Sequence, residues 1–392
     1  MKAAQINVAF CENGAGFGGA IISLAAFLEK LPAPLRPYIY TGIGTAQYSA
    51  LARLGAWIHM PPVTLVSQER IRRSGMPWSS TIDNVCNLLP YALNYYRAFR
   101  RQRIDLVYLN NDTSSNIAAA LAGKLARRPL VLHARGFNSN NKGSRWVLAN
   151  LHHCIAVSQA VRNELLTLGL APDKCTVVPE GLDLTVYHPR APATQLLAEL
   201  GLTALQPVIT LVGGLVDWKG QDVLLDAAPA ILERFPDACI LLVGSAYGKD
   251  HAFAEMIAQR AAALGPRVRM LGARADVADL LSISSVVLHT STKPEPFGRT
   301  FLEGMALGKA VIASNEGGPL DVIEHEVDGL LIAPRQPAVL AGAVIRLLSE
   351  PTFAAALAQQ AAIKARSYSI ERHAKDVTAV IYKVLKIADN SD

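Results

Sequence analysis

The sequence predicts an α/β protein built from two doubly wound parallel sheets. Short, continuously apolar runs alternate with helical stretches along nearly all of the 392 residues, as expected for parallel strands that are buried on both faces. A chain of this length suits two domains. The segment Pro189-Arg190-Ala191-Pro192 marks the break between them. We therefore expect an N-terminal domain over residues 1–190 and a C-terminal domain over residues 191–369.

The apolar runs give two sets of expected strands. The first set has five members: Ile6–Phe10, Leu106–Leu109, Leu130–His133, Cys154–Val157 and Thr176–Val178. The second set has six: Val208–Val212, Cys239–Val243, Val268–Leu271, Val286–His289, Ala310–Ala313 and Leu330–Ile332. Doubly wound sheets bind ligands at the carboxyl ends of their strands, so the loops that follow these runs hold the candidate site residues.

Charge divides unevenly between the two halves. Residues 1–190 hold 20 Lys and Arg against 10 Asp and Glu, whereas residues 191–392 hold 18 against 22. The basic clusters are Arg70-Ile71-Arg72-Arg73, Arg97 with Arg100-Arg101-Gln102-Arg103, and Arg127-Arg128. They are either solvated helix ends or a surface that contacts anionic lipid or an anionic saccharide. No zinc finger, RRM signature or basic heptad region is present, so no nucleic-acid partner is expected.

The cysteine content and the hydropathy of the sequence indicate the cellular compartment in which the protein is expected. Five scattered cysteines without a C-x-x-C pair indicate a reduced environment. Gln5 and Asn7 interrupt the first apolar run, and no run approaches the ~18–20 residues that cross a bilayer. We expect a cytoplasmic protein that could contact the inner face of the membrane peripherally. No Asp-x-Asp, His-x-x-x-His or Cys/His cluster indicates a metal site.

Two carboxylates flank an expected helix start in the segment Pro294–Glu303. Glu295 lies in a proline-rich loop, and Glu303 lies on a helix expected from about Arg299 to Leu307. The free N–H groups of the first helical turn form an anion site between them. A ligand with a sugar at one end, a diphosphate in the middle and a ribose at the other would fit.

A glycine-rich loop near the N-terminus matches G-x-G-x-x-G through Gly14, Gly16 and Gly19. Two features argue against dinucleotide binding. The first glycine comes four residues after the expected strand, and residues 34–41 hold only Arg36 where an acidic residue would bind the ribose. The alternatives are a loop that lets a phosphate or saccharide approach the helix beginning near Gly19, or a purely structural glycine loop.

Other strand ends carry further candidates. Lys219 lies where a helix begins, an unfavourable place for a cation unless it meets an anion such as a diphosphate; a surface lysine is the alternative. Gly244 follows a strand and could pack against a nucleotide. Arg274 lies in a loop that could read a base edge or be a plain loop. His133 and Arg135 share one strand end, which favours a functional role for both.

Together these segments resemble the retaining GT-B glycosyltransferases of family 4. Pro294–Glu303 is similar to the family's Glu-x7-Glu motif, and the segment from Gly304 to Pro319 continues the likeness. Ile155–Ser158 and Val178–Asp183 are similar to its interdomain segment. The resemblance covers nearly the whole chain and is strongest over Ile155–Pro334.

The resemblance implies a fold and a reaction. Two Rossmann-like domains would face a cleft, and a last helix over about 370–387 would cross back onto the N-terminal domain. A sugar would pass with retention from a UDP-, GDP- or ADP-sugar to a saccharide or lipid-linked acceptor, in cell-surface polysaccharide or glycoconjugate synthesis. No cofactor or catalytic metal is implied. The leaving phosphate would itself accept the proton of the acceptor hydroxyl.

The resemblance also implies residue roles. Glu295 would contact the transferred sugar, Glu303 the ribose and Lys219 the diphosphate, and His133 would lie near the sugar. The remaining donor residues would be Gly18, Gly19, Gly244, Arg274, Phe297, Gly298, Arg299 and Thr300. Gly19 and Arg135 are assigned to the acceptor.

The sequence departs from the family pattern at Gly214, where an arginine is common. Arg299 or Arg135 would then have to supply the second cation at the diphosphate. Otherwise the enzyme is slow, or the chain is a catalytically silent subunit that binds a nucleotide sugar; an NAD-dependent oxidoreductase is the second rival. Glu180 replaces the asparagine of Pro-Asn-Gly, a change expected to be minor.

Overall fold

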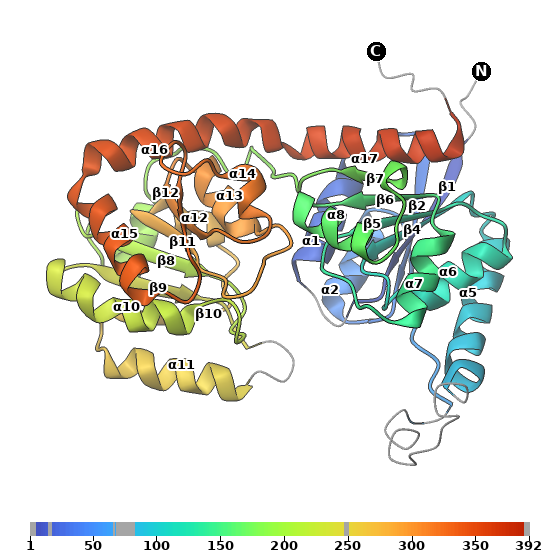
Figure 1. The fold of residues 1–392 in the computed structure, drawn as a ribbon, viewed down its shortest axis with the longest axis horizontal. Helices are drawn as coiled ribbons and strands as arrows, with labels where there is room; N and C mark the ends of the chain where they lie inside the picture. Colours follow the sequence, from blue (N-terminus) through green and yellow to red (C-terminus); the bar gives the residue numbers. More distant parts are fainter. Residues whose placement is uncertain (1–4, 15–17, 66, 68–82, 247–250, 388–392) are drawn as a thin grey trace. The chain divides into compact units, whose positions relative to one another are not determined.

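The fold divides into two compact units (Figure 1). The computed structural model describes residues 5–14, 18–65, 67, 83–246 and 251–387. Unit 1 comprises Met1–Gly181 and Ile370–Asp392, and unit 2 comprises Leu182–Ser369. The division thus falls after residue 181, whereas the sequence analysis placed it after residue 190.

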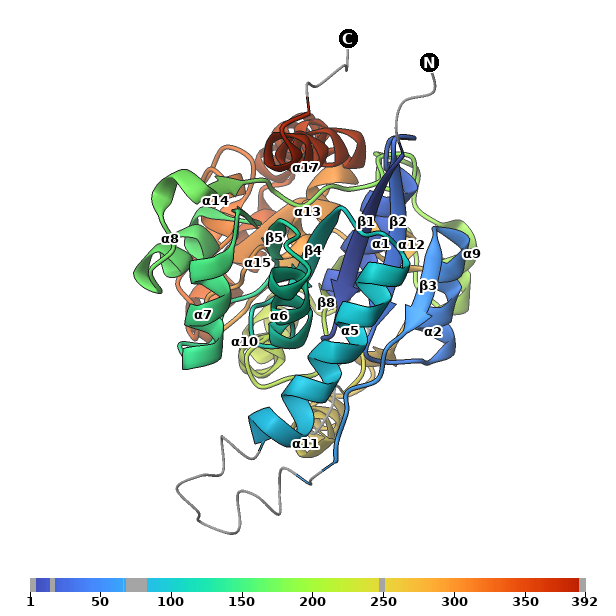
Figure 2. The ribbon, with the colours of Figure 1, turned by 90° about the vertical axis from the view of Figure 1, so that its right-hand side faces the viewer.

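Unit 1 contains a parallel sheet of seven strands in the order β3-β2-β1-β4-β5-β6-β7; Figure 2 shows the part from β3 to β5. The strands are β1 (Ile6–Glu12), β2 (Leu35–Thr41), β3 (Ala56–His59), β4 (Leu106–Asn111), β5 (Leu130–Ala134), β6 (His153–Ala156) and β7 (Cys175–Val177). The five expected strands are confirmed, and β2 and β3 were missed. Arg36 and Pro37 interrupt the apolar run of β2, and β3 is a four-residue edge strand with no buried residue.

Helices cover both faces of this sheet. They are α1 (Gly19–Glu29), α2 (Ala46–Ser49), α5 (Leu89–Arg101), α6 (Ile117–Leu125), α7 (Lys142–Asn150), α8 (Gln159–Thr167) and α17 (Ile370–Leu385). Leu24 and Phe27 of α1 share a buried core with Val377 and Ile381 of α17 and with Phe10 of β1. The last helix therefore completes the core of unit 1, which confirms the predicted return of the chain to the N-terminal domain.

Unit 2 contains a parallel sheet of six strands in the order β10-β9-β8-β11-β12-β13. The strands are β8 (Val208–Val212), β9 (Cys239–Val243), β10 (Val268–Gly272), β11 (Val286–His289), β12 (Ala310–Ser314) and β13 (Leu330–Ile332). All six expected strands are confirmed. Most are apolar runs between polar turns, whereas the edge strand β10 contains Arg269. Strand β11 pairs with both β8 and β12, so it lies in the middle of the sheet.

The helices of unit 2 pack on both faces of its sheet. They are α9 (Thr194–Glu199), α10 (Gln221–Arg234), α11 (His251–Ala263), α12 (Val277–Ser282), α13 (Arg299–Ala306), α14 (Pro319–Val322), α15 (Pro337–Ser349) and α16 (Pro351–Ala365). One buried core joins α10, α11, α15 and α16 to the sheet, and a second joins α9 and α12 to the other face. Helix α13 begins at Arg299, as predicted.

Two glycines let the loops at the carboxyl ends of this sheet touch. Gly220 has a φ of 75°, and a Cβ there would lie 2.0 Å from the carbonyl oxygen of Thr290. Gly317 has a φ of 74°, and its Cβ would lie 2.1 Å from the carbonyl oxygen of Glu295. The loop that follows β12 therefore packs against the backbone of Glu295. Gly318 N–H donates a hydrogen bond of 2.8 Å to the Glu295 carbonyl.

We expect Gly317→Ala to destabilise the protein more than Gly201→Ala. Both residues have positive φ, so each alanine costs about 1–2 kcal/mol in backbone strain. Gly201 has no atom within 4 Å of its Cβ position, whereas Gly317 faces a backbone oxygen. The clash should add about 1–3 kcal/mol, as overpacking usually does. Urea unfolding measures the free energy of unfolding of both variants. Equal losses of stability would show that the loop containing Gly317 can move to accommodate the added Cβ, and would contradict the prediction.

Candidate active site

The structure brings Lys219 and Glu295 into contact at the carboxyl ends of β8 and β11. Lys219 Nζ lies 2.7 Å from Glu295 Oε2, although the residues are 76 positions apart. Strand β8 is bonded to β9 on one side and to β11 on the other, so the pair lies at the point where the winding of the sheet reverses. Thr292 N–H, which donates 2.8 Å to Trp218 O, joins the two loops. This is where open α/β sheets bind ligands.

Glu295 is held as an ionised hydrogen-bond acceptor. It is 8% exposed, and Ser291 Oγ donates to Oε2 at 2.8 Å. Burial raises the pKa of this carboxyl, but Lys219, His289 and Ser291 together outweigh it and hold the pKa below its ordinary value. Burial lowers the pKa of His289 to about 4, against the opposing charge of Glu295. His289 is therefore neutral near pH 7.

Glu303 lies one turn into α13 and is 7% exposed. Arg299 Nη2 lies 3.4 Å from its Oε1. Burial raises the pKa of Glu303 above its ordinary value, and Arg299 offsets this only in part. The two glutamates thus differ in environment: Glu295 has a lysine in direct contact, and Glu303 has an arginine at longer range.

Three other predicted donor residues shape the start of α13. Phe297 is buried, with its ring centroid 6.0 Å from that of Phe301. Gly298 has positive φ at the N-cap, and Thr300 Oγ1 donates to Val212 O at 3.3 Å, which joins α13 to the end of β8. Phe297 and Thr300 therefore fix the helix start, and their contacts with a donor stay predictions.

The two remaining predicted donor residues of unit 2 lie after β9 and β10. Gly244 N–H donates to Gly272 O at 2.8 Å. The Arg274 guanidinium contacts Asp276 at 2.6 Å and Glu199 at 3.0 Å. Arg274 is thus engaged by two carboxylates, and its predicted contact with a base is not tested by this arrangement.

Gly214 leaves a gap in the expected set of cations. Its carbonyl accepts a hydrogen bond of 2.9 Å from Gln221 Nε2, but it offers no side chain. Lys219 and Arg299 are the cations that contact the two glutamates in the described part of unit 2.

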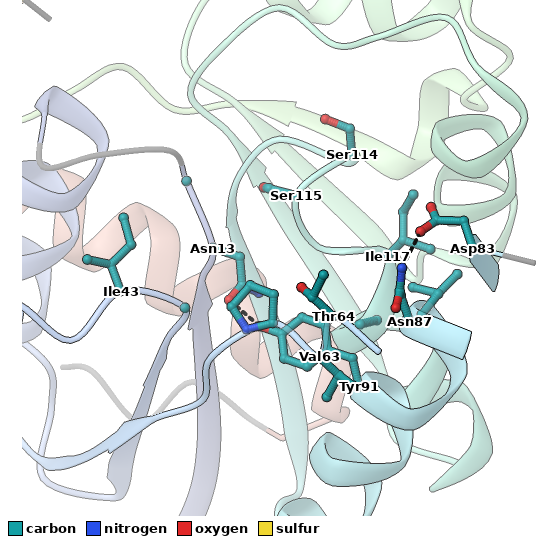
Figure 3. Close-up of a pocket in the computed structure, with 15 residues that line it drawn as sticks. Asn13, Ile43, Val63, Thr64, Asp83, Asn87, Tyr91, Ser114, Ser115 and Ile117 are labelled. Atoms are coloured by element: carbon teal, nitrogen blue, oxygen red, sulfur yellow. Dashed lines mark hydrogen bonds between the residues drawn. The ribbon is translucent and has the colours of Figure 1, made fainter. Parts of the chain in front are cut away.

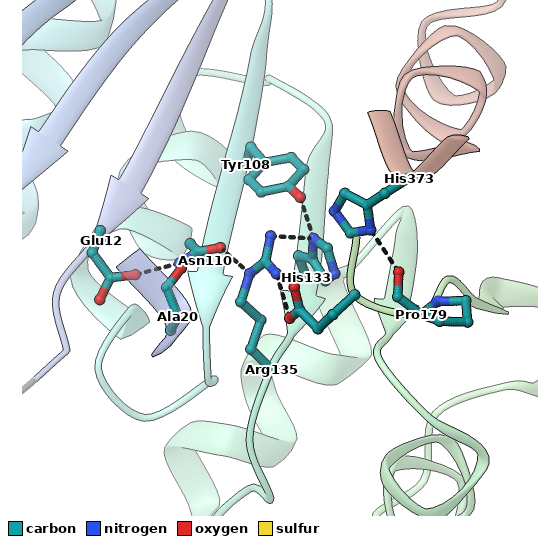
Figure 4. Close-up of polar contacts among 9 residues, drawn as sticks. Glu12, Ala20, Tyr108, Asn110, His133, Arg135, Pro179 and His373 are labelled. Carbon is teal, nitrogen blue, oxygen red and sulfur yellow. Dashed lines mark hydrogen bonds and ion pairs between the residues drawn. The ribbon is translucent and has the colours of Figure 1, made fainter. Parts of the chain in front are cut away.

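In unit 1, Arg135 and Glu180 form a buried ion pair; Figure 4 shows Arg135 with its neighbours Asn110 and His133. Arg135 Nη1 lies 2.5 Å from Glu180 Oε1, and the side chains are 2% and 6% exposed. Arg135 Nε also donates to Asn110 Oδ1 at 2.8 Å, and Asn110 Nδ2 donates to the buried carboxylate of Glu12. Glu180 thus neutralises a buried guanidinium, and the expectation that its replacement of asparagine is minor stays a prediction.

His133 lies inside the same network. It is fully buried, its Nδ1 lies 3.2 Å from Arg135 Nη2 and contacts Tyr108 Oη, and its ring stacks on that of His373 at 5.6 Å. Burial, followed by the charges of Arg135 and His373, lowers its pKa well below the usual range. His133 is therefore a neutral interior residue, and the predicted contacts of His133 with the sugar and of Arg135 with the acceptor stay predictions.

The glycine loop corrects one step of the sequence analysis. Strand β1 ends at Glu12 rather than Phe10, so Gly14 follows the strand by two residues, not four. The second argument against a dinucleotide site holds, because β2 ends at Thr41, whose hydroxyl bonds Trp57 and Ile43. Gly18 caps α1 and Gly19 begins it; Gly16 lies outside the described residues.

Several sequence predictions concern surfaces and metals. Arg70–Arg73 lies outside the described residues, whereas Arg97, Arg100, Arg101 and Arg127 are exposed.

The described residues contain no cluster of three His, Cys, Asp or Glu side chains suited to a metal. No single described helix is long and apolar enough to span a bilayer, although the bent pair Pro337–Ser349 and Pro351–Tyr368 passes by length and composition.

His289 and Ser291 contact Glu295 but were not predicted from the sequence. Strand β11 ends in Val-Val-Leu-His and β5 contains Leu-Val-Leu-His, yet only His133 was selected. His289 Nε2 lies 3.5 Å from Glu295 Oε2. A search for polar residues at the ends of apolar runs would have identified His289. Ser291 has no such signal.

Two family models cover most of the chain. The model described as Glycosyl transferases group 1 matches residues 195–364, and the model described as Glycosyltransferase Family 4 matches residues 50–186. The chain belongs to the family 4 glycosyltransferases. The motif-based resemblance to this family is thereby confirmed.

Individual relatives agree with this membership. A D-inositol 3-phosphate glycosyltransferase of Rhodococcus jostii is 33% identical over 257 residues, which are 63% of this chain and 56% of the relative. The chain thus spans little more than half the length of the curated relatives it matches.

Solved structures show the GT-B fold. Anabaena HepE, solved in complex with UDP and glucose, superposes with a TM-score of 0.81 at 24% identity, over 97% of this chain and 100% of its own. A glycosyltransferase of Rickettsia africae gives 0.80 at 20% identity, over 98% and 100%.

Removal of Glu180 should destabilise the protein strongly. Glu180→Ala leaves the Arg135 guanidinium buried without its counter-ion, and breaking a buried pair costs about 3–5 kcal/mol. The double variant Arg135→Met/Glu180→Leu should recover most of the loss. Glu29→Ala, which breaks the exposed pair with Arg53, serves as the control and should cost less than about 1 kcal/mol. A small loss for Glu180→Ala in urea unfolding would contradict the assignment.

Removal of Lys219 should reverse the pKa shift of Glu295. In Lys219→Met, burial is no longer offset by the lysine, so the pKa of Glu295 should rise above its ordinary value. In the wild type the lowered pKa means that ionised Glu295 adds stability above its unfolded pKa, which is lost as pH falls through the folded pKa. Carbon-13 NMR titration of the glutamate carboxyls measures the shift, with the exposed Lys293→Met as control. An unchanged pKa would sink this account.

Proposed function

We propose that the chain transfers a sugar, with retention, from a nucleotide diphosphate sugar to a hydroxyl of a saccharide or lipid-linked acceptor. The observation that carries the proposal is the contact of 2.7 Å between Lys219 and Glu295 at the switch point of the unit 2 sheet, with Glu303 one turn into the adjoining helix. A cation and two carboxylates around one helix start suit a ligand with an anionic centre and hydroxyl-bearing ends.

Each part of the donor has a residue suited to it. The diphosphate would lie against Lys219 and the free N–H groups of α13, where the helix dipole favours negative charge. Glu295, held ionised by its neighbours, would accept hydrogen bonds from the hydroxyls of the transferred sugar. Glu303 would do the same for the ribose. A UDP-sugar is the first donor to test, since HepE was also solved in complex with UDP-glucose.

The chemistry follows from where charge develops. The bond between the anomeric carbon and the diphosphate oxygen breaks, and its electron pair leaves with the phosphate. A new bond forms from the acceptor oxygen to the anomeric carbon on the same face, and the acceptor proton passes to the leaving phosphate oxygen. Lys219 stabilises the charge on the leaving group, so we propose that no metal is required.

The setting of the reaction is part of the same proposal. We place it in the cytoplasm or on the inner face of the membrane, in the synthesis of a cell-surface polysaccharide or glycoconjugate. The exposed arginines Arg97, Arg100 and Arg101 on α5 support contact with an anionic surface. Neither rival function gains support: among the residues that the structure describes, Gly214 is the only feature that favours a silent subunit, and no acidic residue ends β2.

Lys219→Ala should abolish most of the transfer without unfolding the protein. Loss of one charge-stabilising donor lowers the rate by ~10²–10³. Lys293→Ala is the matched control, because Lys293 lies in the loop after β11 but is 55% exposed and pairs with Asp217. The measurement is release of nucleotide diphosphate from a labelled donor, with the anomeric configuration of the product read by proton NMR.

The donor is found by thermal shift against UDP-, GDP- and ADP-sugars, because binding raises the melting temperature by mass action. Near-normal turnover in Lys219→Ala would overturn the proposed role. Binding of a donor without transfer or hydrolysis would favour the silent subunit, and an inverted product would overturn retention.

A further inference from the structure

Two cysteines of unit 1 lie directly opposite each other at one edge of the sheet. Cys154 belongs to β6 and Cys175 begins β7, and the register of these parallel strands pairs the two residues. Neighbouring strands are about 4.7–4.9 Å apart, and paired residues point to the same face of the sheet. Disulfides span about 4.4–6.8 Å between their Cα atoms. The backbone therefore places the two thiols where a disulfide can form.

The other cysteines on the described strands have no cysteine opposite them. Cys11 of β1 is paired with Tyr40 and with Leu109, and Cys239 of β9 is paired with Val208. The sequence contains no C-x-x-C pair, so the folding of the sheet alone brings two of its scattered thiols together.

The two paired thiols differ in exposure and in acidity. Cys154 is fully buried, whereas Cys175 is partly exposed, like the other two residues of β7. The hydrogen bond with Cys154 lowers the pKa of the Cys175 thiol against the effect of burial, and the charge of Arg162 adds to the lowering. Burial, followed by the contact with Cys175, raises the pKa of Cys154. Cys175 is therefore the thiol that ionises first and that a solute can reach.

Strand β7 is placed so that it can adjust. It is the last strand in the order of the described sheet and is bonded to β6 alone (Figure 1). It is also short, since it covers only Cys175–Val177. A shift that brings the two sulfurs to bonding distance would therefore disturb one ladder of hydrogen bonds rather than two.

We propose that Cys175 and Cys154 form a reversible oxidation site, at which a hydroperoxide converts the two thiols into a disulfide. Cys175 is the attacking thiol, and Cys154 is the thiol that resolves the intermediate. Intracellular disulfides are usually transient and redox-sensing, so a pair that oxidises and is reduced again agrees with the expected reduced compartment. Exchange with a small thiol such as glutathione returns the pair to its reduced form.

The oxidation has two balanced steps. The Cys175 thiolate attacks one oxygen of hydrogen peroxide, and the O–O bond breaks. The other oxygen leaves as hydroxide and takes the proton that Cys175 released, which gives water and a Cys175 sulfenic acid. The Cys154 sulfur then attacks the Cys175 sulfur, and the S–O bond breaks. The hydroxyl group leaves as a second water with the proton of Cys154, so the thiols lose two electrons and the peroxide gains them.

This oxidation site is separate from the other sites of the protein. Unit 1 contains a cavity of about 500 Å³ that is lined by Asn13, Thr64 and Tyr91 among others (Figure 3). Neither cysteine of the pair is among the described residues that line this cavity. The candidate donor residues Lys219 and Glu295 belong to unit 2. The oxidation therefore does not depend on the proposed function, and it can be tested without a sugar donor.

The first test identifies the product in the full chain. The reduced protein is treated with hydrogen peroxide, its remaining thiols are alkylated, and it is digested without a reductant. Mass spectrometry should detect a peptide pair linked through Cys154 and Cys175, and dithiothreitol should restore both thiols. A Cys175 that stays reduced, or that accumulates as sulfenic or sulfinic acid without the linked pair, would overturn the proposal.

The second test assigns the two roles. In Cys154→Ser the oxidation should stop at the Cys175 sulfenic acid, so labelling of Cys175 by dimedone should rise at least tenfold above the wild type. Cys154→Ala repeats the test without a buried hydroxyl, and circular dichroism verifies the fold of each variant. In Cys175→Ser, Cys154 should stay reduced. Equal dimedone labelling of the wild type and the Cys154 variants would show that Cys154 does not resolve the intermediate.

Cys86→Ser is the matched control. Cys86 is also partly exposed, but it lies outside the strands. This variant should form the Cys154–Cys175 disulfide at the wild-type rate. Loss of the disulfide in Cys86→Ser would show that the oxidation passes through Cys86, and would refute direct attack by Cys175.

Discussion

Two strands that are neighbours in a parallel sheet must end at the same edge, and the candidate donor site depends on this constraint. Residues 219 and 295 belong to loops far apart in the chain, but β8 and β11 are hydrogen-bonded neighbours. The backbone therefore places both loops together before any side chain interacts. Gly220 and Gly317 have no side chains, so the backbones of the neighbouring loops can approach closely. This close approach brings Lys219 and Glu295 within contact distance. Charge recognition here follows from backbone geometry.

In unit 1, the polar and charged side chains at the carboxyl ends of the strands are bonded to one another inside the fold. Polar residues at the ends of β1, β4 and β5 turn inward and satisfy one another, from Glu12 through Asn110 to Arg135 and Glu180. The buried guanidinium of Arg135 is tolerated because Glu180 pairs with it, whereas burial raises the pKa of Glu12, which is bonded to an amide. The two units thus share one architecture but differ in the exposure of their cations. In unit 2 Lys219 is 20% exposed beside Glu295, whereas in unit 1 Arg135 is buried.

Much of the fold could be predicted because parallel strands that are buried on both faces have continuously apolar sequences. The exceptions have physical causes: Arg36 and Pro37 hide β2, and β3 is a short edge strand that buries nothing. Residues in the Glu295–Glu303 loop were recognisable because their spacing is local. The Arg135–Glu180 pair was not, since 45 positions separate its members and no periodicity links a strand end to a linker. Its importance depends on burial, which the sequence does not state.

The path of the chain also sets an order of events during synthesis. Unit 2 is one continuous segment, and its ends meet where Leu182 N–H donates to Tyr368 O at 2.8 Å. Unit 1 is split, because its core includes Ala374, Val377 and Ile381 from the last helix. Domains generally fold as the ribosome releases them, N-terminal first. Here unit 1 can complete its core only after α17 has been synthesised, so its apolar surface stays uncovered while all of unit 2 is made.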